Sequence, residues 1–366
     1  MSPRGAIIIC IAIGLLNTLF LLNKISPISS LPTWATPVAK ANQRLDITTA
    51  ISNATLGFEK VIAIGLPERS DKRDALSLMA SVTGFTLAWV DGVLGSSISE
   101  KAIPSGWNRE KLLESNLGSW RGHINAIRSV VEDGLSSALI LEDDADWDVH
   151  LKQQLAEFAE AAQTLQEQEH EHEHHPQSPQ LDVPGNSPYG QHWDLLWLGA
   201  CVSRFSNDRH EAQVLIHDDA TVASHAHLIQ NGTFSWDEYP ERARIVYVPA
   251  GDTICTFGYA VSRAGARKAL QYLGVEDQPT TFDFHMSDLC REAHLGMRCV
   301  AVVPGLFMHH RPRGRVLGDS DILEKGGDEG DTVREVGFTE NILYSTRLNL
   351  GNLVQGLEPV KQWDDG

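Results

Sequence analysis

Five carboxylates gather within seven residues near the middle of the chain, directly after the apolar run Ala138–Leu141. They are Glu142, Asp143, Asp144, Asp146 and Asp148. Like charges a few ångströms apart disfavour each other's ionised forms, so such a cluster needs raised pKa values or a cation. Oxygen ligands suit Mg²⁺, Mn²⁺ or Ca²⁺ better than zinc. The cluster therefore predicts a divalent-cation site at the end of a strand.

An EF-hand loop or a solvated helix cap could also give rise to an acidic cluster. An EF-hand loop counted from Asp144 lacks the Gly required at position 6 and the Glu required at position 12, so a calcium loop of that kind is excluded. A solvated acidic turn at a helix amino end accounts for Asp146 and Asp148. It accounts poorly for Glu142 and Asp144, which can point to the same side of an extended chain and are the expected metal ligands.

Strand and helix patterns around the cluster indicate how it is positioned. Lys60–Leu66 is short, apolar and β-branched, as a strand buried on both faces should be, and helical spacing follows over Ser70–Val82. A helical apolar stripe covers Leu117–Asp133, and Ser136–Glu142 is the next strand. This alternation predicts an α/β fold with a mostly parallel sheet flanked by helices, in which ligands collect beyond the carboxyl ends of the strands.

The amino-terminal residues carry the features of a membrane anchor and a stem. Residues 5–22 contain no charge and would span roughly 27 Å as a helix, close to the thickness of a thin bilayer. We expect a cytoplasmic tail over 1–4, a single-pass type II signal anchor over 5–22 and a stem over 23–56, with a cleaved signal peptide and secretion as the alternative. The body, 57–366, would lie in the Golgi or endoplasmic reticulum lumen and contain a solvated low-complexity insertion at about 163–191.

Composition and cysteine usage agree with a lumenal globular body. The chain of 366 residues is 42% hydrophobic, and its net charge of −18 opposes binding to nucleic acid. Acceptor triplets for N-glycosylation begin at Asn53 and Asn231. Four cysteines outside the anchor allow three disulfide pairings and show no zinc spacing. They are Cys201, Cys255, Cys290 and Cys299.

Four stretches between about Lys60 and His310 carry a family resemblance. They are VIAIGLPERSDKRDAL, LGSWRGHINAIRSVVEDGLSSALILEDDAD, GYAVSRAGARKAL, and FDFHMSDLC followed by VVPGLFMHH. With these stretches the chain resembles glycosyltransferase family 25, which includes bacterial lipooligosaccharide galactosyltransferases and procollagen galactosyltransferases. It departs from the family pattern at Gly65, where Asn is usual, and in the displacement of one arginine of the usual pair.

The resemblance implies a GT-A-like (Rossmann-like) fold and a metal-dependent transfer of a sugar from a nucleotide diphosphate donor, UDP-galactose in the best-known members. The acceptor would be a hydroxyl of a glycan, a glycoprotein or a lipid-linked saccharide. Mn²⁺ or Mg²⁺ would bind at an Asp-x-Asp-like motif formed by Glu142 and Asp144, with Asp143 beside the donor. His309 or His310 would supply a further metal ligand, with ordinary loop polarity as the alternative.

The resemblance also suggests donor contacts and a general base. The expected donor contacts are Arg69, Arg73 and His123, with ordinary surface arginines and a structural histidine as the alternatives. An inverting transfer needs a base to accept the proton of the acceptor hydroxyl. Asp283 and Asp288 are the candidates because flanking apolar residues could raise a pKa, and Asp252 is the reserve. Helix capping is the alternative, for Asp288 above all.

Two further functions remain open from the sequence. A metal-dependent phosphohydrolase also gathers Asp and Glu around hard cations, but it normally needs more metal-spaced ligands than this chain shows. A nonenzymatic lumenal calcium-binding protein is supported only by the net charge of −18.

Overall fold

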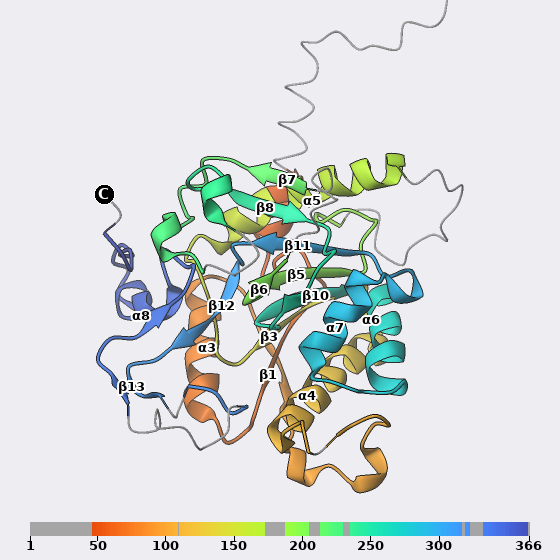
Figure 1. Cartoon of the computed structure of the whole chain (residues 1–366). Helices are drawn as coiled ribbons and strands as arrows, with labels where there is room; N and C mark the ends of the chain where they lie inside the picture. The colour runs from red at the N-terminus through yellow and green to blue at the C-terminus, as the bar shows by residue number, and fades with distance from the viewer. Residues whose placement is uncertain are drawn as a thin grey trace, which may run out of the picture. The chain divides into compact units, whose positions relative to one another are not determined.

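A central eight-stranded sheet organises the part of the chain that the computed structural model describes, residues 46–108, 110–172, 187–204, 213–229, 235–316, 319–322 and 332–364 (Figure 1). In order across the sheet, the strands are β2 (Ala88–Asp91), β1 (Lys60–Gly65), β3 (Ser137–Glu142), β10 (Gly258–Ser262), β5 (Leu195–Gly199), β11 (Cys299–Val303), β8 (Arg244–Tyr247) and β7 (Gln213–Ile216).

Most strands of the sheet run in the same direction, as the sequence predicts for a mostly parallel sheet. β1 pairs in parallel with β2 and β3, and β5 pairs in parallel with β11. Only β10 and β8 among these eight strands run the other way. The register pairs Ile64 with Glu142 and Gly65 with Asp91, so the carboxyl ends of β1, β2 and β3 meet at one edge.

Helices cover both faces of the sheet because side chains alternate along each strand. In β3, for example, Leu139 and Leu141 join one core, whereas Ala138 and Ile140 join the other. The first core includes α3 (Ser70–Val82) and α5 (Leu151–His172). The second includes α4 (Glu114–Glu132), α6 (Arg263–Leu270) and α7 (Phe282–Arg291).

Smaller elements complete the described fold. A three-stranded sheet contains β4 (Ala145–Trp147), β12 (Phe307–Arg311) and β15 (Phe338–Thr339), and two-stranded pairs join β13 (Gly314–Arg315) to β14 (Val333–Arg334) and β6 (Val202–Ser203) to β9 (Thr253–Ile254). Helix α8 (Thr346–Val354) packs beside α3. Short 3₁₀ helices lie at Gly95–Ser97, Glu100–Ala102, His225–His227, Trp236–Glu238 and His294–Gly296, and a π turn lies at Gln271–Val275.

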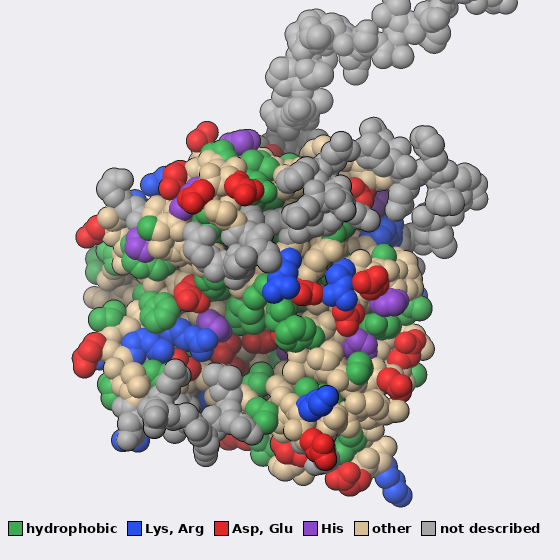
Figure 2. Space-filling model, viewed as in Figure 1, with side chains coloured by type: hydrophobic (Ala, Val, Ile, Leu, Met, Phe, Trp, Pro, Cys, Tyr) green, Lys and Arg blue, Asp and Glu red, His purple; other side chains and the backbone are tan. Residues whose placement is uncertain are grey.

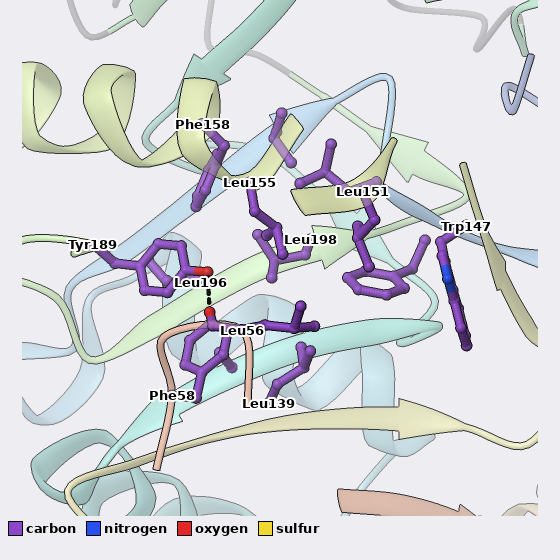
Figure 3. Close-up of a cluster of buried hydrophobic side chains, with 14 of the residues drawn as sticks. Leu56, Phe58, Leu139, Trp147, Leu151, Leu155, Phe158, Tyr189, Leu196 and Leu198 are labelled. Atoms are coloured by element: carbon purple, nitrogen blue, oxygen red, sulfur yellow. Dashed lines mark hydrogen bonds between the residues drawn. The ribbon is translucent and has the colours of Figure 1, made fainter. Parts of the chain in front are cut away.

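The folded body begins before residue 57, so the predicted boundary of the stem is wrong. Residues 46–51 are helical, and Ile51 and Leu56 are fully buried in the first core. Figure 3 shows Leu56 in this core, where its carbonyl accepts a hydrogen bond from the Tyr189 hydroxyl at 2.6 Å. Apolar side chains late in the predicted stem therefore belong to the fold.

The predicted solvated insertion at 163–191 is also too wide. Helix α5 continues to His172, and Leu165, Gln166 and Tyr189 are buried. The Gln166 amide donates to the carbonyl of Tyr189 at 2.8 Å, which ties the two flanks of the segment together. The buried face of this Gln-rich helix is difficult to recognise in the sequence because it contains only a few apolar residues.

Several sequence predictions lie outside the described residues. These are the tail, the anchor at 5–22, most of the stem, and the acceptor triplet at Asn231. Within the described residues, no helix has the length and apolar content to cross a membrane. The described acceptor Asn53 is exposed.

Two disulfides select one of the three pairings left open by the sequence. Cys201 is bonded to Cys255, and Cys290 is bonded to Cys299. The first bridge joins the segment after β5 to the segment before β10, and the second joins the end of α7 to the start of β11.

Candidate active site

A pocket of about 610 Å³ lies at the carboxyl ends of β1, β2 and β3, where the sequence predicts a ligand. Glu142, Asp143 and Asp144 line it together with residues of α4, the amino end of α7 and β12. Figure 2 shows acidic side chains set back in a hollow near the middle of the face in view. Most of the pocket lining is apolar, so charge is confined to one part of it.

The acidic residues of the pocket occupy the last position of a strand and the turn that follows it. β3 ends at Glu142, residues 143–144 form the turn, and β4 begins at Ala145. The expectation of an extended chain through Glu142 and Asp144 is therefore wrong, although both side chains do line the pocket, as expected of residues that point to the same side. The turn also brings Asp143 to the same place.

Glu142 is held by groups of the protein itself. Its Oε1 accepts a hydrogen bond from the Thr256 hydroxyl at 2.6 Å and lies 3.4 Å from His123 Nε2. Burial acts to raise the pKa of Glu142, but the hydrogen bonds from His123 and Thr256 and the charge of His123 hold it below its ordinary value. His123 is buried, stacks on Phe282 and contacts the Tyr259 hydroxyl at 3.1 Å. His123 thus lines the pocket and also orients Glu142.

A lysine that the sequence analysis did not identify stands among the other carboxylates. Lys72 Nζ donates to Asp143 Oδ1 at 3.0 Å and to Asp321 Oδ2 at 2.9 Å, and it lies 3.5 Å from Asp144 Oδ2. Its side chain is only 11% exposed. Burial opposes its charge, yet Asp144 and Asp143 raise the pKa of Lys72 above its ordinary value. The ammonium group therefore remains charged inside the site.

Asp144 carries negative charge that the described residues compensate only in part. Burial raises its pKa to about 6, Lys72 opposes this shift, and the charges of Glu142 and Asp143 add to it. Asp144 Oδ1 is buried and has no hydrogen-bond partner. A buried carboxylate oxygen without a donor is costly, and a cation would remove that cost.

A hard divalent cation fits this donor set if substrate supplies its other ligands. Within the described residues, no three His, Cys, Asp or Glu side chains are grouped to hold a metal ion. Mg²⁺ commonly binds only one or two carboxylates together with water and substrate phosphates. The unpartnered Asp144 Oδ1 is suited to that role, with Lys72 occupying the other side of the carboxylate.

The two adjacent histidines of β12 face in different directions, as successive strand residues do. His309 lines the pocket against the Phe257 ring, and burial lowers its pKa to about 4, with the charge of Arg311 adding to that shift. A neutral imidazole can bind a metal. His310 instead contacts the Thr339 hydroxyl at 3.0 Å and does not line the pocket, so the structure does not place it with the other predicted metal ligands.

Asp146 and Asp148 are structural residues, and their interpretation as a solvated acidic cap is wrong because both are fully buried. Asp146 accepts hydrogen bonds from Thr339 and Ser345, and Asp148 accepts from the Tyr344 backbone at 2.9 Å. The two carboxylates fix the carboxyl-terminal segment against β4.

The two predicted donor arginines do not line the pocket. Arg73 donates to the Gly65 carbonyl at 2.7 Å and lies over the Trp89 ring, so it fixes the end of β1. Arg69 pairs with Asp71 and with Asp321 at the edge of the pocket.

The lack of a side chain at Gly65 leaves room for the carboxylate of Asp143. A Cβ atom at this position would lie 2.7 Å from Asp143 Oδ2 and 2.8 Å from Asp143 Cβ, closer than real contacts allow. Asn cannot occupy this position while Asp143 keeps its present orientation.

Of the three candidate bases, only Asp283 lines the pocket. It accepts hydrogen bonds from the Cys255 backbone at 3.1 Å and from the Thr281 hydroxyl at 2.6 Å. Asp288 pairs with Arg291, and Asp252 pairs with Arg291 and Arg204, so neither of these two carboxylates reaches the pocket.

Sequence reasoning missed Lys72, Asp321 and Thr256. Lys72 lies in the same quoted motif as Arg69 and Arg73 and could have been found as a third cation of that turn. Asp321 is 249 residues from Lys72 in a polar segment, and no local signal connects them.

A mostly parallel sheet with its pocket at the strand ends defines an α/β protein that binds its ligand at this edge. Comparison with known proteins narrows the class, because the chain is similar to glycosyltransferase 25 family members. It is 24% identical over 228 residues to procollagen galactosyltransferase 1 of Danio rerio, covering 59% of this chain and 29% of that protein. It is 25% identical over 251 residues to the Bos taurus protein named "probable inactive glycosyltransferase 25 family member 3", covering 64% of this chain and 33% of that protein.

The matches thus extend over about a third or less of each relative's length. No protein-family model matches the chain. The two similarities support the assignment of the chain to glycosyltransferases in general.

Proposed function

We propose that the protein is a metal-dependent glycosyltransferase with a GT-A-like fold that moves a sugar from a nucleotide diphosphate donor to a hydroxyl group, with inversion. The observation that carries the proposal is the buried, unpartnered Asp144 Oδ1 in a pocket at the carboxyl ends of parallel strands. It matches the need of a diphosphate donor for a cation between its own negative charge and that of the protein. The similarity to a procollagen galactosyltransferase makes UDP-galactose the first donor to test.

Each pocket residue has a role in the proposed reaction. Asp144, with His309 as a second candidate ligand, would hold Mn²⁺ or Mg²⁺, which when bound would neutralise charge on the departing diphosphate. Glu142 is held by Thr256 and His123 and shapes the pocket wall beside them. Lys72 supplies a fixed positive charge next to the acidic turn.

Asp283 is the proposed general base. Its carboxylate would take the proton of the acceptor hydroxyl while the acceptor oxygen forms a bond to the anomeric carbon and the bond to the diphosphate oxygen breaks. The hydrogen bonds from Cys255 and Thr281 fix its orientation in the pocket wall. The acceptor would be a glycan, a glycoprotein or a lipid-linked saccharide.

The protein is proposed to act in the Golgi or endoplasmic reticulum lumen. Two disulfides and an exposed glycosylation acceptor at Asn53 are features of chains that fold in an oxidising compartment. The proposed signal anchor at 5–22 would hold the body at the membrane.

The proposal is tested by nucleoside diphosphate release from a panel of UDP- and GDP-sugars by the full chain, with Mn²⁺ and with a chelator. We expect turnover of one donor that stops with the chelator and in Asp144→Asn. Asp283→Asn should keep donor affinity while losing turnover, and Asp288→Asn is its matched control outside the pocket. A folded protein that neither binds nor turns over any donor would refute the proposal, and binding without turnover would assign a nonenzymatic role.

A further inference from the structure

A short segment from the carboxyl-terminal part of the chain crosses the edge of the pocket. We call Asp319–Ile322 the strap. Its first residue is anchored outside the pocket, since Asp319 accepts two hydrogen bonds from Arg334 at 3.0 and 2.8 Å. Its last residue is anchored on α4, where the Ser115 hydroxyl donates to the carbonyl of Ile322 at 2.7 Å. The residues between these anchors line the pocket.

The strap places one carboxylate on two cations at the edge of the pocket. Asp321 accepts from Lys72 at 2.9 Å and forms a second ion pair with Arg69. Asp321 lines the pocket and Arg69 does not. The ion pair between them therefore lies at the edge of the pocket. At 35% exposure Asp321 is the most accessible acid around Lys72, compared with 12% for Asp143 and 19% for Asp144.

Given the proposed function, we infer that Asp321 occupies the place of a donor phosphate group and that binding of the donor diphosphate displaces it from Arg69 and Lys72. Guanidinium groups bind carboxylate and phosphate oxygens with the same forked geometry, so one anion can replace the other. Asp143 and Asp144 lie on the turn between β3 and β4 and are less exposed than Asp321, so Asp321 is the acid best placed for such an exchange. Asp321 thereby sets the affinity of the pocket for the donor.

The direct test is the affinity of Asp321→Asn for inorganic pyrophosphate and for UDP, measured by titration calorimetry on the full chain with and without Mn²⁺. Removal of the competing charge should lower both Kd values by about fivefold to twentyfold, as expected for two partly exposed ion pairs. Glu335→Gln removes one exposed carboxylate from the same part of the chain and should change each Kd by less than about twofold. Ser115→Ala removes the hydrogen bond that anchors Ile322 on α4. It should also lower both Kd values, but by a smaller factor than Asp321→Asn.

The other outcomes identify which part of the reasoning fails. Unchanged Kd values in a folded Asp321→Asn protein would refute the competition while leaving the proposed function intact. Weaker binding that appears only with Mn²⁺ would show that Asp321 helps to hold the cation, and it would also refute competition. If neither protein binds UDP under any condition, both the inference and the proposed function are wrong.

Discussion

Substitution of Asp144 by Asn should stabilise the metal-free protein while abolishing its proposed activity. The Asp144 side chain is 19% exposed and has one buried, unpartnered oxygen, and burial raises its pKa to about 6 from the ordinary 3.8. That difference corresponds to about 3 kcal/mol of folding free energy lost when the group is ionised. Asn has nearly the same shape and no charge, so it removes this cost. We therefore expect the free energy of unfolding to rise by up to about 3 kcal/mol at pH 7.5.

The pH dependence identifies the cause of the stabilisation. Because the pKa of Asp144 is higher in the folded state, the folded protein binds a proton that the unfolded chain has already lost between about pH 4 and pH 6. The difference between Asp144→Asn and the wild type should be small below pH 4, grow up to about pH 6 and stay constant above it.

Urea denaturation with a chelator at pH 4, 5, 6 and 7.5 measures this difference, with Glu335→Gln as the control for a general change in net charge. Addition of Mn²⁺ should narrow the gap because it stabilises only the wild type, by mass action. A variant that is equally or less stable than the wild type at pH 7.5, or a gap that does not change with pH, would show that the charge of Asp144 is already compensated.

Three further predictions concern the scaffold. Gly118→Ala should destabilise the protein by about 1–3 kcal/mol in thermal unfolding, because its Cβ would lie 2.3 Å from a backbone carbonyl, whereas Gly351→Ala meets nothing within 4 Å and should not destabilise. Burial, with nearby arginine charges, lowers the pKa of His310 to about 3. Below pH 6.5 the free energy of unfolding of the wild type should therefore fall by up to about 1.4 kcal/mol per pH unit relative to that of His310→Gln. Parallel profiles of stability against pH would contradict this prediction. Removal of the Cys201–Cys255 bridge should lower the free energy of unfolding by about 1.6 kcal/mol more than removal of the Cys290–Cys299 bridge, as measured by denaturant unfolding. The bridges join residues 54 and 9 positions apart, and closing a longer loop removes more entropy from the unfolded chain. Equal losses would argue against loop entropy as the cause.

The sequence predicts those parts of the site that depend on local pattern. An apolar run followed by acidic residues predicted a strand that ends at Glu142 beside Asp144, and the helical stripe predicted α4 and the position of His123 on it. The alternation of strand and helix segments along the chain predicted the sheet and the edge at which the pocket lies. These features depend on residues that are close in the sequence, so the spacing of residue types along the chain is enough to predict them.

The sequence does not predict contacts between distant segments. Asp321 meets Lys72 across 249 residues, and Arg204 pairs with Asp252 across 48 residues. Four cysteines allow three pairings, and no spacing rule selects Cys201 with Cys255. Long-range packing also decided that residues near Leu56 belong to the core.

The absence of a side chain at Gly65 links two positions that are far apart in the sequence. Because the carboxylate of Asp143 fills the space that a Cβ atom would need, position 65 cannot gain a side chain while Asp143 stays as it is. A descendant that acquired Asn at position 65 would have to reorient or replace residue 143 in the same lineage. Related chains should therefore show correlated replacement at these two positions, an inherited record of a single steric contact.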